Sequence, residues 1–286
     1  MPCYRHVRRA TCAQPLLRNV ARTYVLTMEN SNRAPDYDKI DRICSETYVV
    51  YNKGYRACSK AGVSTTNEDI IHAYRNATRH AMDDGLQSVL IIEDDAVFVD
   101  DESDWAEVDK FVGAEPFALY SLGTISFTWP ATLNLKHHMA HSPFFAPVHA
   151  TIWSSPAMHE MAAVQIPDVT KPDRQLDNDI MHTFEPKYMY YKPLAVQTFP
   201  SSKSQSTWPS TACLWWVKSL QLDRSIFPGW RVLYIGNNMY PILVVTFVAT
   251  LLVWFTTRNV WLTGIPPALV ITFGLTVLGV TLDLSR

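Results

Sequence analysis

The chain has 286 residues, which is enough for one or two domains with a substantial hydrophobic core. Its 25 Lys and Arg residues nearly balance its 27 Asp and Glu residues, so the formal net charge is -2. This balance argues against nucleic acid as the main partner. The hydrophobic content of 48% is ordinary for a globular protein, but the apolar residues are concentrated near the C-terminus.

Residues 1–22 are basic. They contain five Arg residues and no acidic residue, and they lack the continuous apolar stretch of a secretory signal. We predict a basic N-terminal arm that precedes the folded domain, with an amphipathic transit peptide as the alternative.

The five cysteines form no CxxC pair and have no histidine partner at zinc-site spacing. They are Cys3, Cys12, Cys44, Cys58 and Cys213. An odd number without a paired pattern predicts free thiols in a reducing compartment, and it argues against a disulfide scaffold and a zinc site.

Residues 23–210 show strands separated by helices, which predicts an α/β sheet. The expected strands are residues 23–28, 46–51, 88–92, 117–121, 148–153, 188–191 and 195–198. A first long helix is expected from a capping box formed by Thr65 and Glu68 to a stop at Gly85. Further helices are expected over residues 104–112, from a cap at Ser155 to residue 164, and over residues 173–183.

The helix that stops at Gly85 has one apolar face and one basic face, which carries His72, Arg75 and Arg79. We expect the basic face to be solvated, and a role near phosphate groups is the alternative.

Three acidic residues, Glu93, Asp94 and Asp95, directly follow an apolar strand. Desolvating an ionised carboxylate costs several kcal/mol, so this cluster predicts a compensating cation. If the extended backbone continues, Glu93 and Asp95 share one face and Asp94 takes the other. Two carboxylates suit Mg²⁺ or Mn²⁺, which keep open positions for substrate phosphates, and ligands of α/β sheets bind at such strand ends. A solvated acidic turn is the alternative.

Two uncharged runs, residues 241–257 and 260–282, are each long enough to cross a bilayer. They predict a membrane hairpin within residues 239–286, preceded by a linker over residues 211–238; two buried core helices are the alternative. Basic residues flank the hairpin at Lys218, Arg224, Arg231 and Arg286. The positive-inside rule then places both termini, and with them the folded domain, on the cytosolic side of the membrane.

Several segments together resemble glycosyltransferase family 25, the group that includes lipopolysaccharide and collagen galactosyltransferases. The resemblance begins with Tyr24-Val-Leu-Thr-Met and Arg33, the helix ending at Gly85, and the run Val89-Leu-Ile-Ile-Glu-Asp-Asp-Ala-Val-Phe98. It continues through Tyr120-Ser-Leu-Gly123, His149-Ala-Thr-Ile-Trp153, Asp177-Asn178, Gln197 and residues 201–206. The resemblance implies a GT-A-like fold over residues 23–210, a nucleotide-sugar donor and a bound Mn²⁺ or Mg²⁺ ion.

One departure from the family pattern stands at the start of the long helix. The family has a Gly-Cys pair and a Ser-His pair there, whereas this chain has Gly62-Val-Ser-Thr-Thr and Ile71-His72. The chain therefore resembles a divergent member, and the sugar and the acceptor do not carry over.

The resemblance and the residue chemistry together predict a metal-dependent transferase. Asp95 is expected to bind the metal, with Glu93 beside it directly or through water, while Asp94 contacts the ribose or supports the loop. The general base is expected at Asp177, with Asp179 as the other candidate.

Three further residues are donor-site candidates: His149, Ser202 and Lys203. The alternatives are a strand histidine satisfied by backbone groups and a flexible Ser-rich loop. A UDP-sugar is the favoured donor, and a glycan, a lipid-linked molecule or a protein is the acceptor. Two rival functions stay open, a catalytically inactive membrane-bound scaffold with a transferase fold and an aspartyl-phosphate type phosphotransferase.

Overall fold

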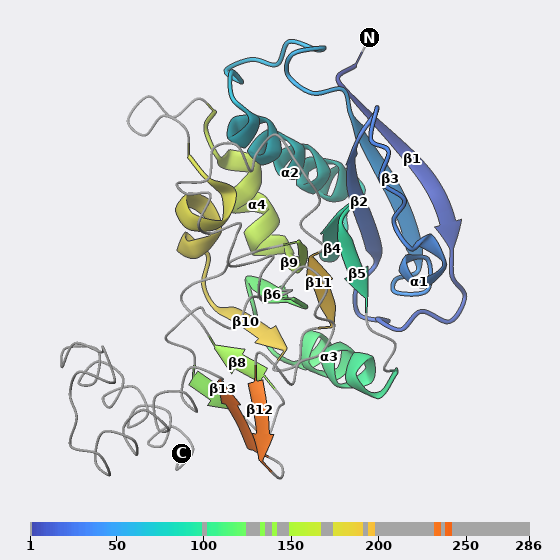
Figure 1. Ribbon diagram of the computed structural model, residues 1–286, viewed down its shortest axis with the longest axis vertical. Coiled ribbons are helices and arrows are strands. Elements are labelled where there is room, and N and C mark those ends of the chain that lie inside the picture. Colours follow the sequence, from blue (N-terminus) through green and yellow to red (C-terminus); the bar gives the residue numbers. More distant parts are fainter. Residues whose placement is uncertain are drawn as a thin grey trace, which may run out of the picture.

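The computed structural model describes residues 2–98, 102–123, 132–134, 139–141, 149–166, 174–190, 194–197, 232–235 and 238–241. These residues form a mixed α/β fold around a sheet with the strand order β1-β3-β2-β4-β9-β6-β10-β8-β7 (Figure 1). The strands of this sheet are β1 (Tyr4–Thr11), β2 (Arg22–Met28), β3 (Glu46–Asn52), β4 (Ser88–Glu93), β6 (Leu119–Ser121), β7 (Thr132–Asn134), β8 (Met139–His141), β9 (Ala150–Ser154) and β10 (Lys187–Tyr190). The predicted α/β class is confirmed.

Two strand pairs lie outside this sheet. β5 (Ala96–Phe98) pairs with β11 (Ala195–Gln197), and β12 (Val232–Ile235) pairs with β13 (Asn238–Pro241). The described helices are α1 (Tyr37–Ile40), α2 (Thr66–Asp83), α3 (Glu102–Ala114), α4 (Ser155–Ala163) and two short turns, η1 (Leu176–Ile180) and η2 (Met181–Thr183).

The sheet changes its direction of growth between β2 and β4. β3, β2 and β4 are parallel neighbours, and β9 is antiparallel to both β4 and β6. From β2 the chain passes through α1 to β3 on one side, then returns through α2 to β4 on the other side of β2. In α/β sheets, ligands bind at the carboxyl ends of the strands on either side of such a reversal, which here are β2 and β4.

Apolar side chains cover both faces of the sheet. Val89 and Ile91 of β4 pack in the cluster that contains α2 and α4, whereas Leu90 and Ile92 pack in the cluster that contains α1 and α3. Figure 1 shows α2 and α4 side by side, and α3 at another part of the sheet. Because β4 is buried on both faces, its run of four apolar residues carries no alternation between apolar and polar side chains.

The helix predicted from the capping box is confirmed. Thr65 accepts a hydrogen bond from the Glu68 amide, the Glu68 side chain accepts from the Thr65 amide, and Gly85, which follows the C-cap residue Asp84, has a φ of 72°. The left-handed backbone at Gly85 explains why a glycine follows the helix end.

The basic face of α2 is not simply solvated. Arg75 donates to the carbonyl of Val164 (3.0 Å) and Arg79 donates to the carbonyl of Ala162 (2.8 Å). Both carbonyls lie at the C-terminal end of α4, where unpaired carbonyl groups and the helix dipole favour a cation. These arginines therefore join α2 to α4.

The N-terminal segment that we predicted as a separate arm contains strand β1, which pairs antiparallel with β3 at the edge of the sheet. Two of its arginines stack on tyrosine rings: Arg5 lies 4.2 Å above Tyr51 and Arg9 lies 3.9 Å above Tyr37. Charged side chains are typical of edge strands because they hinder pairing with another chain. Four of the five arginines that indicated an arm, Arg5, Arg8, Arg9 and Arg22, are thus part of the sheet.

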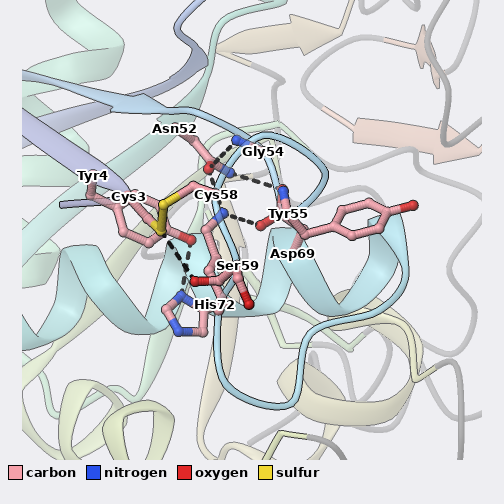
Figure 2. The surroundings of a disulfide bond; sticks show 10 residues. Cys3, Tyr4, Asn52, Gly54, Tyr55, Cys58, Ser59, Asp69 and His72 are labelled. Carbon is pink, nitrogen blue, oxygen red and sulfur yellow. Dashed lines mark hydrogen bonds and ion pairs between the residues drawn. A yellow bond between two sulfur atoms is a disulfide. The ribbon is translucent and has the colours of Figure 1, made fainter. Parts of the chain in front are cut away.

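The prediction of free thiols is wrong for two of the cysteines. Cys3 and Cys58 form a disulfide across 55 residues of sequence. Figure 2 shows it beside Tyr4, whose hydroxyl group shares a 2.9 Å hydrogen bond with His72 Nδ1. Disulfides persist mainly in oxidising compartments, so the cysteines no longer support a reducing one.

Cys12 and Cys44 are free thiols, as predicted. Burial raises the pKa of the Cys44 thiol to about 12. A thiol with this pKa stays protonated and is a poor nucleophile.

Two further predictions are corrected in detail. Residues 173–183 do not form one regular helix, because η1 is a π-helical turn and η2 is a 3-10 turn. The N-cap of α4 is Ser154, so Ser155 is its first residue and Pro156 falls in its first turn. Proline is tolerated there because the first-turn amides have no partner within the helix.

None of the helices in the described ranges has the length and apolarity of a membrane span. Residues 242–282, which make up nearly all of the predicted hairpin, lie outside the described residues.

Candidate functional site

The acidic residues lie at the carboxyl edge of the two central strands. Glu93 is the last residue of β4, and Asp94 and Asp95 form the turn that leads to β5. β2 is the parallel neighbour of β4, with Leu26 opposite Glu93, so the residues that follow Leu26 end at the same edge. The predicted strand-end position of the acidic residues is confirmed.

Asp94 binds the end of β2 and the segment that follows it through hydrogen bonds. Its Oδ2 atom accepts hydrogen bonds from the hydroxyls of Thr27 (2.6 Å) and Ser31 (2.9 Å), and its Oδ1 atom accepts from Arg33 Nη1 (2.5 Å). Asp94 is only 8% exposed, so these partners replace the water that its carboxylate loses on burial. We call residues 29–36 the site loop. Its position depends on Asp94.

Arg33 also reaches Asp95, with 3.6 Å between Nη1 and Oδ2. Asp94 and Asp95 therefore lie together, and the predicted alternation of faces fails. Regular alternation stops at Glu93 because the chain turns there. The Arg33 side chain keeps 26% of its surface exposed, although it pairs with two buried carboxylates.

The local charge balance of this edge is negative. Glu93, Asp94 and Asp95 contribute three carboxylates, and Arg33 supplies one guanidinium. The resulting formal charge of about two minus matches one divalent cation.

Glu93 is held from the α2 side. The Tyr74 hydroxyl donates to Glu93 Oε1 (3.2 Å), and the Glu93 amide donates to the carbonyl of His149 (2.9 Å). Tyr74 is fully buried, with its ring centroid 5.8 Å from that of Trp153. Its packing therefore fixes the position of the hydroxyl that contacts Glu93.

His149 lies against backbone atoms. It is 2% exposed, and its Nε2 atom is 3.2 Å from the carbonyl oxygen of Ala195. Gly123 completes this contact: a Cβ atom at Gly123 would lie 1.9 Å from the Ala195 oxygen and 2.6 Å from His149 Nε2. His149 therefore links the residue that precedes β9 to the first residue of β11.

The predicted base candidates lie in η1. The Asp179 carboxylate accepts a hydrogen bond from the Gln175 amide (2.6 Å), which closes its own turn. Asp177 belongs to the same turn, and its side chain lies outside the described part of the chain. Ser202 and Lys203 also fall outside the described residues.

The acidic edge has fewer metal ligands than a closed metal site. Among the described residues, no group of three or more His, Cys, Asp or Glu side chains could hold a metal ion. The predicted metal ligands, Glu93 and Asp95, lie at the end of β4 and in the turn that follows it, and Asp95 shares Arg33 with Asp94. Two carboxylates fit Mg²⁺ or Mn²⁺, whose remaining positions go to water and substrate phosphates.

Sequence reasoning missed Ser31, and it noted Thr27 and Arg33 only as part of the family resemblance. Thr27 contacts Asp94 from β2, the strand beside β4, and Ser31 and Arg33 contact it from the site loop that follows β2. The signal was available in principle, because parallel strands bring their carboxyl ends to one edge, but it requires knowing that β2 and β4 are neighbours.

Comparison with known proteins gives little further information. No family model matches the chain, and no curated protein matches it. Among solved structures, the crystal structure of A197 from STIV is similar to 59% of this chain and 81% of that chain, with 10% sequence identity and a TM-score of 0.36. A likeness at this level carries no argument about function, so the site itself must carry it.

Proposed function

We propose that the chain is a glycosyltransferase that moves a sugar from a nucleotide-diphosphate donor to an acceptor hydroxyl, within a GT-A-like domain. The observation that carries the proposal is the cluster of Glu93, Asp94, Asp95 and Arg33 at the point where the sheet reverses its direction of growth. Such points bind nucleotides in other α/β sheets.

The charges of the cluster suit a diphosphate. Arg33 presents a guanidinium group, whose planar N–H groups match phosphate oxygens. A divalent ion, when held by Asp95 and Glu93, would neutralise negative charge on the departing diphosphate. Asp94 would keep Arg33 and the site loop in place while the donor binds.

The transfer itself breaks the bond between the anomeric carbon and the diphosphate oxygen, and the electron pair leaves with the diphosphate. In an inverting reaction the acceptor oxygen forms the new bond, and a base takes its proton. We assign that base to Asp177, because the Asp179 carboxylate already binds the Gln175 amide. His149 supports the site from behind, and Ser202 and Lys203 stay candidates for closing over the donor.

The C-terminal hydrophobic residues would locate the proposed enzyme at a membrane. Residues 239–286 would tether the domain to a membrane and bring it near a lipid-linked, glycan or protein acceptor.

The test is hydrolysis or transfer of several nucleotide sugars by the full-length chain in detergent, with Mn²⁺ and with a chelator. We expect turnover of one donor only with the metal, and a loss of at least about a hundredfold in Asp95→Asn. Asp83→Asn, which changes an exposed carboxylate on α2, is the matched control and should keep full activity. Metal-dependent nucleotide binding without turnover would instead support a non-catalytic scaffold.

A further inference from the structure

The segment between β3 and α2, residues 53–65, is the second loop at the carboxyl edge of the sheet. We call it the disulfide loop, because Cys58 within it is bonded to Cys3 just before β1. The amide of Lys53 also donates to the Cys3 carbonyl (3.2 Å). The segment before β1 and this loop are therefore joined by a backbone hydrogen bond and by the covalent bond that Figure 2 shows.

A buried polar cluster lies under the disulfide loop. Lys60 Nζ donates to Asn52 Oδ1 (2.6 Å) and forms an ion pair with Asp69. The same Asn52 oxygen accepts from the Gly54 amide (2.8 Å), and the Tyr55 amide donates to Asp69 Oδ2 (3.3 Å). Figure 2 shows Asn52, Gly54, Tyr55 and Asp69 gathered beside the disulfide.

This cluster is stable only while the loop stays closed. The Lys60 side chain is 2% exposed, and burial lowers the pKa of its amino group. A buried ion pair has lost its hydration, so it depends on the partners that surround it. If the loop opens, Lys60 leaves Asn52 and Asp69 together with the amides of Gly54 and Tyr55.

The disulfide loop also touches the strand that leads to the candidate site. A Cβ atom at Gly54 would lie 2.7 Å from the methyl group of Met28, the last residue of β2. The Glu29 amide donates to the Asn52 carbonyl (2.8 Å), and the Ser31 amide donates to the Met28 carbonyl (2.9 Å). Ser31 then binds Asp94 through its hydroxyl. A continuous set of contacts thus runs from the disulfide loop through the site loop to Asp94.

We propose that the Cys3–Cys58 disulfide is a redox-sensitive lock that keeps the disulfide loop closed and so maintains the binding-competent shape of the site loop. The binding part of this inference rests on the proposed function. Reduction by a dithiol supplies two electrons to the S–S bond. Cys3 and Cys58 each gain a proton, and the dithiol closes to its own disulfide. The reduced form then samples the closed loop for only part of the time, which weakens ligand affinity by that fraction.

The first test measures opening of the disulfide loop in the absence of any ligand. Arg56 is exposed within the disulfide loop, so trypsin can report its opening by the rate of cleavage after Arg56. We expect dithiothreitol to raise this rate about tenfold in the full-length chain and reoxidation to reverse the change. The double variant Cys3→Ser/Cys58→Ser should be cleaved quickly with or without the dithiol. Cys12→Ser, which removes a free thiol, should behave like the wild type.

The second test measures binding by calorimetry, with uridine, guanosine and adenosine diphosphates in turn in the presence of Mn²⁺. We expect the Kd of the diphosphate that binds to rise about threefold or more on reduction and to recover on reoxidation. A reduced protein that keeps the wild-type circular dichroism spectrum has a loosened loop and has not unfolded.

The outcomes of the two tests distinguish a failure of the disulfide lock from a failure of the proposed function. Equal cleavage rates in both redox states overturn the lock, and so does faster cleavage with an unchanged Kd, because the loop would then have no influence on the site. If no diphosphate binds in either state, the proposed function fails, and the cleavage rates alone decide whether the disulfide holds the loop.

Discussion

At the scale of single residues, two neighbouring carboxylates have different tasks. Asp94 has partners for both oxygens in Thr27, Ser31 and Arg33, so it is built into the fold. Asp95 contacts Arg33 at the longer distance of 3.6 Å, and it is the carboxylate to which the proposed function assigns the cation. The prediction that Asp94 supports the loop and Asp95 binds the metal could be made from the sequence only through the family resemblance, because spacing does not reveal the partners.

This division predicts that one substitution mainly lowers stability and that the other mainly lowers metal affinity. Asp94→Asn removes the charge that Arg33 pairs with, so we expect it to lower the free energy of unfolding by about 1–3 kcal/mol. Asp95→Asn removes one of three clustered carboxylates and a longer ion pair, so it should lower that free energy by less than Asp94→Asn does, and it should weaken Mn²⁺ binding at least tenfold. Denaturant unfolding and a Mn²⁺ titration of both variants check the pair. The same stability loss in both variants, with equal metal affinity, would count against separate tasks.

At the scale of elements, close packing joins β6, β9 and β11 behind the acidic turn. The approach of Gly123 to the Ala195 carbonyl and to His149 leaves no room for a side chain. The sequence contained this glycine within a family-like segment, but the reason for it is visible only when three distant segments are brought together.

We therefore expect Gly123→Ala to lower the free energy of unfolding by about 2–4 kcal/mol, because backbone atoms must shift to accept the methyl group. Gly113→Ala is the matched control. There the nearest atoms belong to the Asn19 side chain, which can rotate, so the change should stay within about 1 kcal/mol. Denaturant unfolding of both variants measures the difference, and equal losses would contradict this packing.

The contact between β1 and α2 predicts acid sensitivity. Burial lowers the pKa of both His6 and His72 to about 4, and neighbouring cations add to this effect. For His6 the surrounding groups are His80, Arg22, Asp84 and Asn76; for His72 they are Arg75, Lys60, Asp69 and Arg79. In the unfolded chain these imidazoles have a pKa of about 6.5, so the unfolded state binds protons first as the pH falls.

These histidines therefore contribute fully to the free energy of unfolding above about pH 6.5, and this contribution is lost as the pH falls towards about 4. The midpoint temperature of thermal unfolding should fall as the pH is lowered from 7 to 4. His6→Gln should reduce the slope of this midpoint temperature against pH. His159→Gln, an exposed histidine on α4, should leave the slope as it is in the wild type. A slope unaffected by His6→Gln would refute this assignment.

At the scale of the whole molecule, local patterns predicted most elements but not their arrangement. The capping box and apolar periodicity were sufficient for α2, and short apolar runs were sufficient for β2, β3 and β4. The insertion of β9 between β4 and β6, the use of an arginine-rich edge strand and the bond between Cys3 and Cys58 all join distant segments. No local pattern encodes such contacts. The site could accordingly be placed at a strand end, while the contacts that Asp94 makes with Thr27 and with the site loop could not be identified.

The C-terminal region leads to a prediction about the complete chain. If residues 239–286 form a membrane hairpin, the full-length protein should float with phosphatidylcholine vesicles and resist extraction by alkaline carbonate. A chain truncated after residue 238 should stay in the soluble fraction. Flotation of both forms, or of neither, would contradict a C-terminal tether.

The most direct measurement of the central claim is a calorimetric titration of the full-length chain in detergent with nucleoside diphosphates. Three conditions are compared: wild type with Mn²⁺, wild type with a chelator, and Asp95→Asn with Mn²⁺. We predict that one diphosphate binds the wild type with Mn²⁺, and that its affinity falls at least about tenfold in the other two conditions. Affinity that is the same in all three conditions, or no binding of any diphosphate, would contradict a cation-dependent diphosphate site at the ends of β2 and β4.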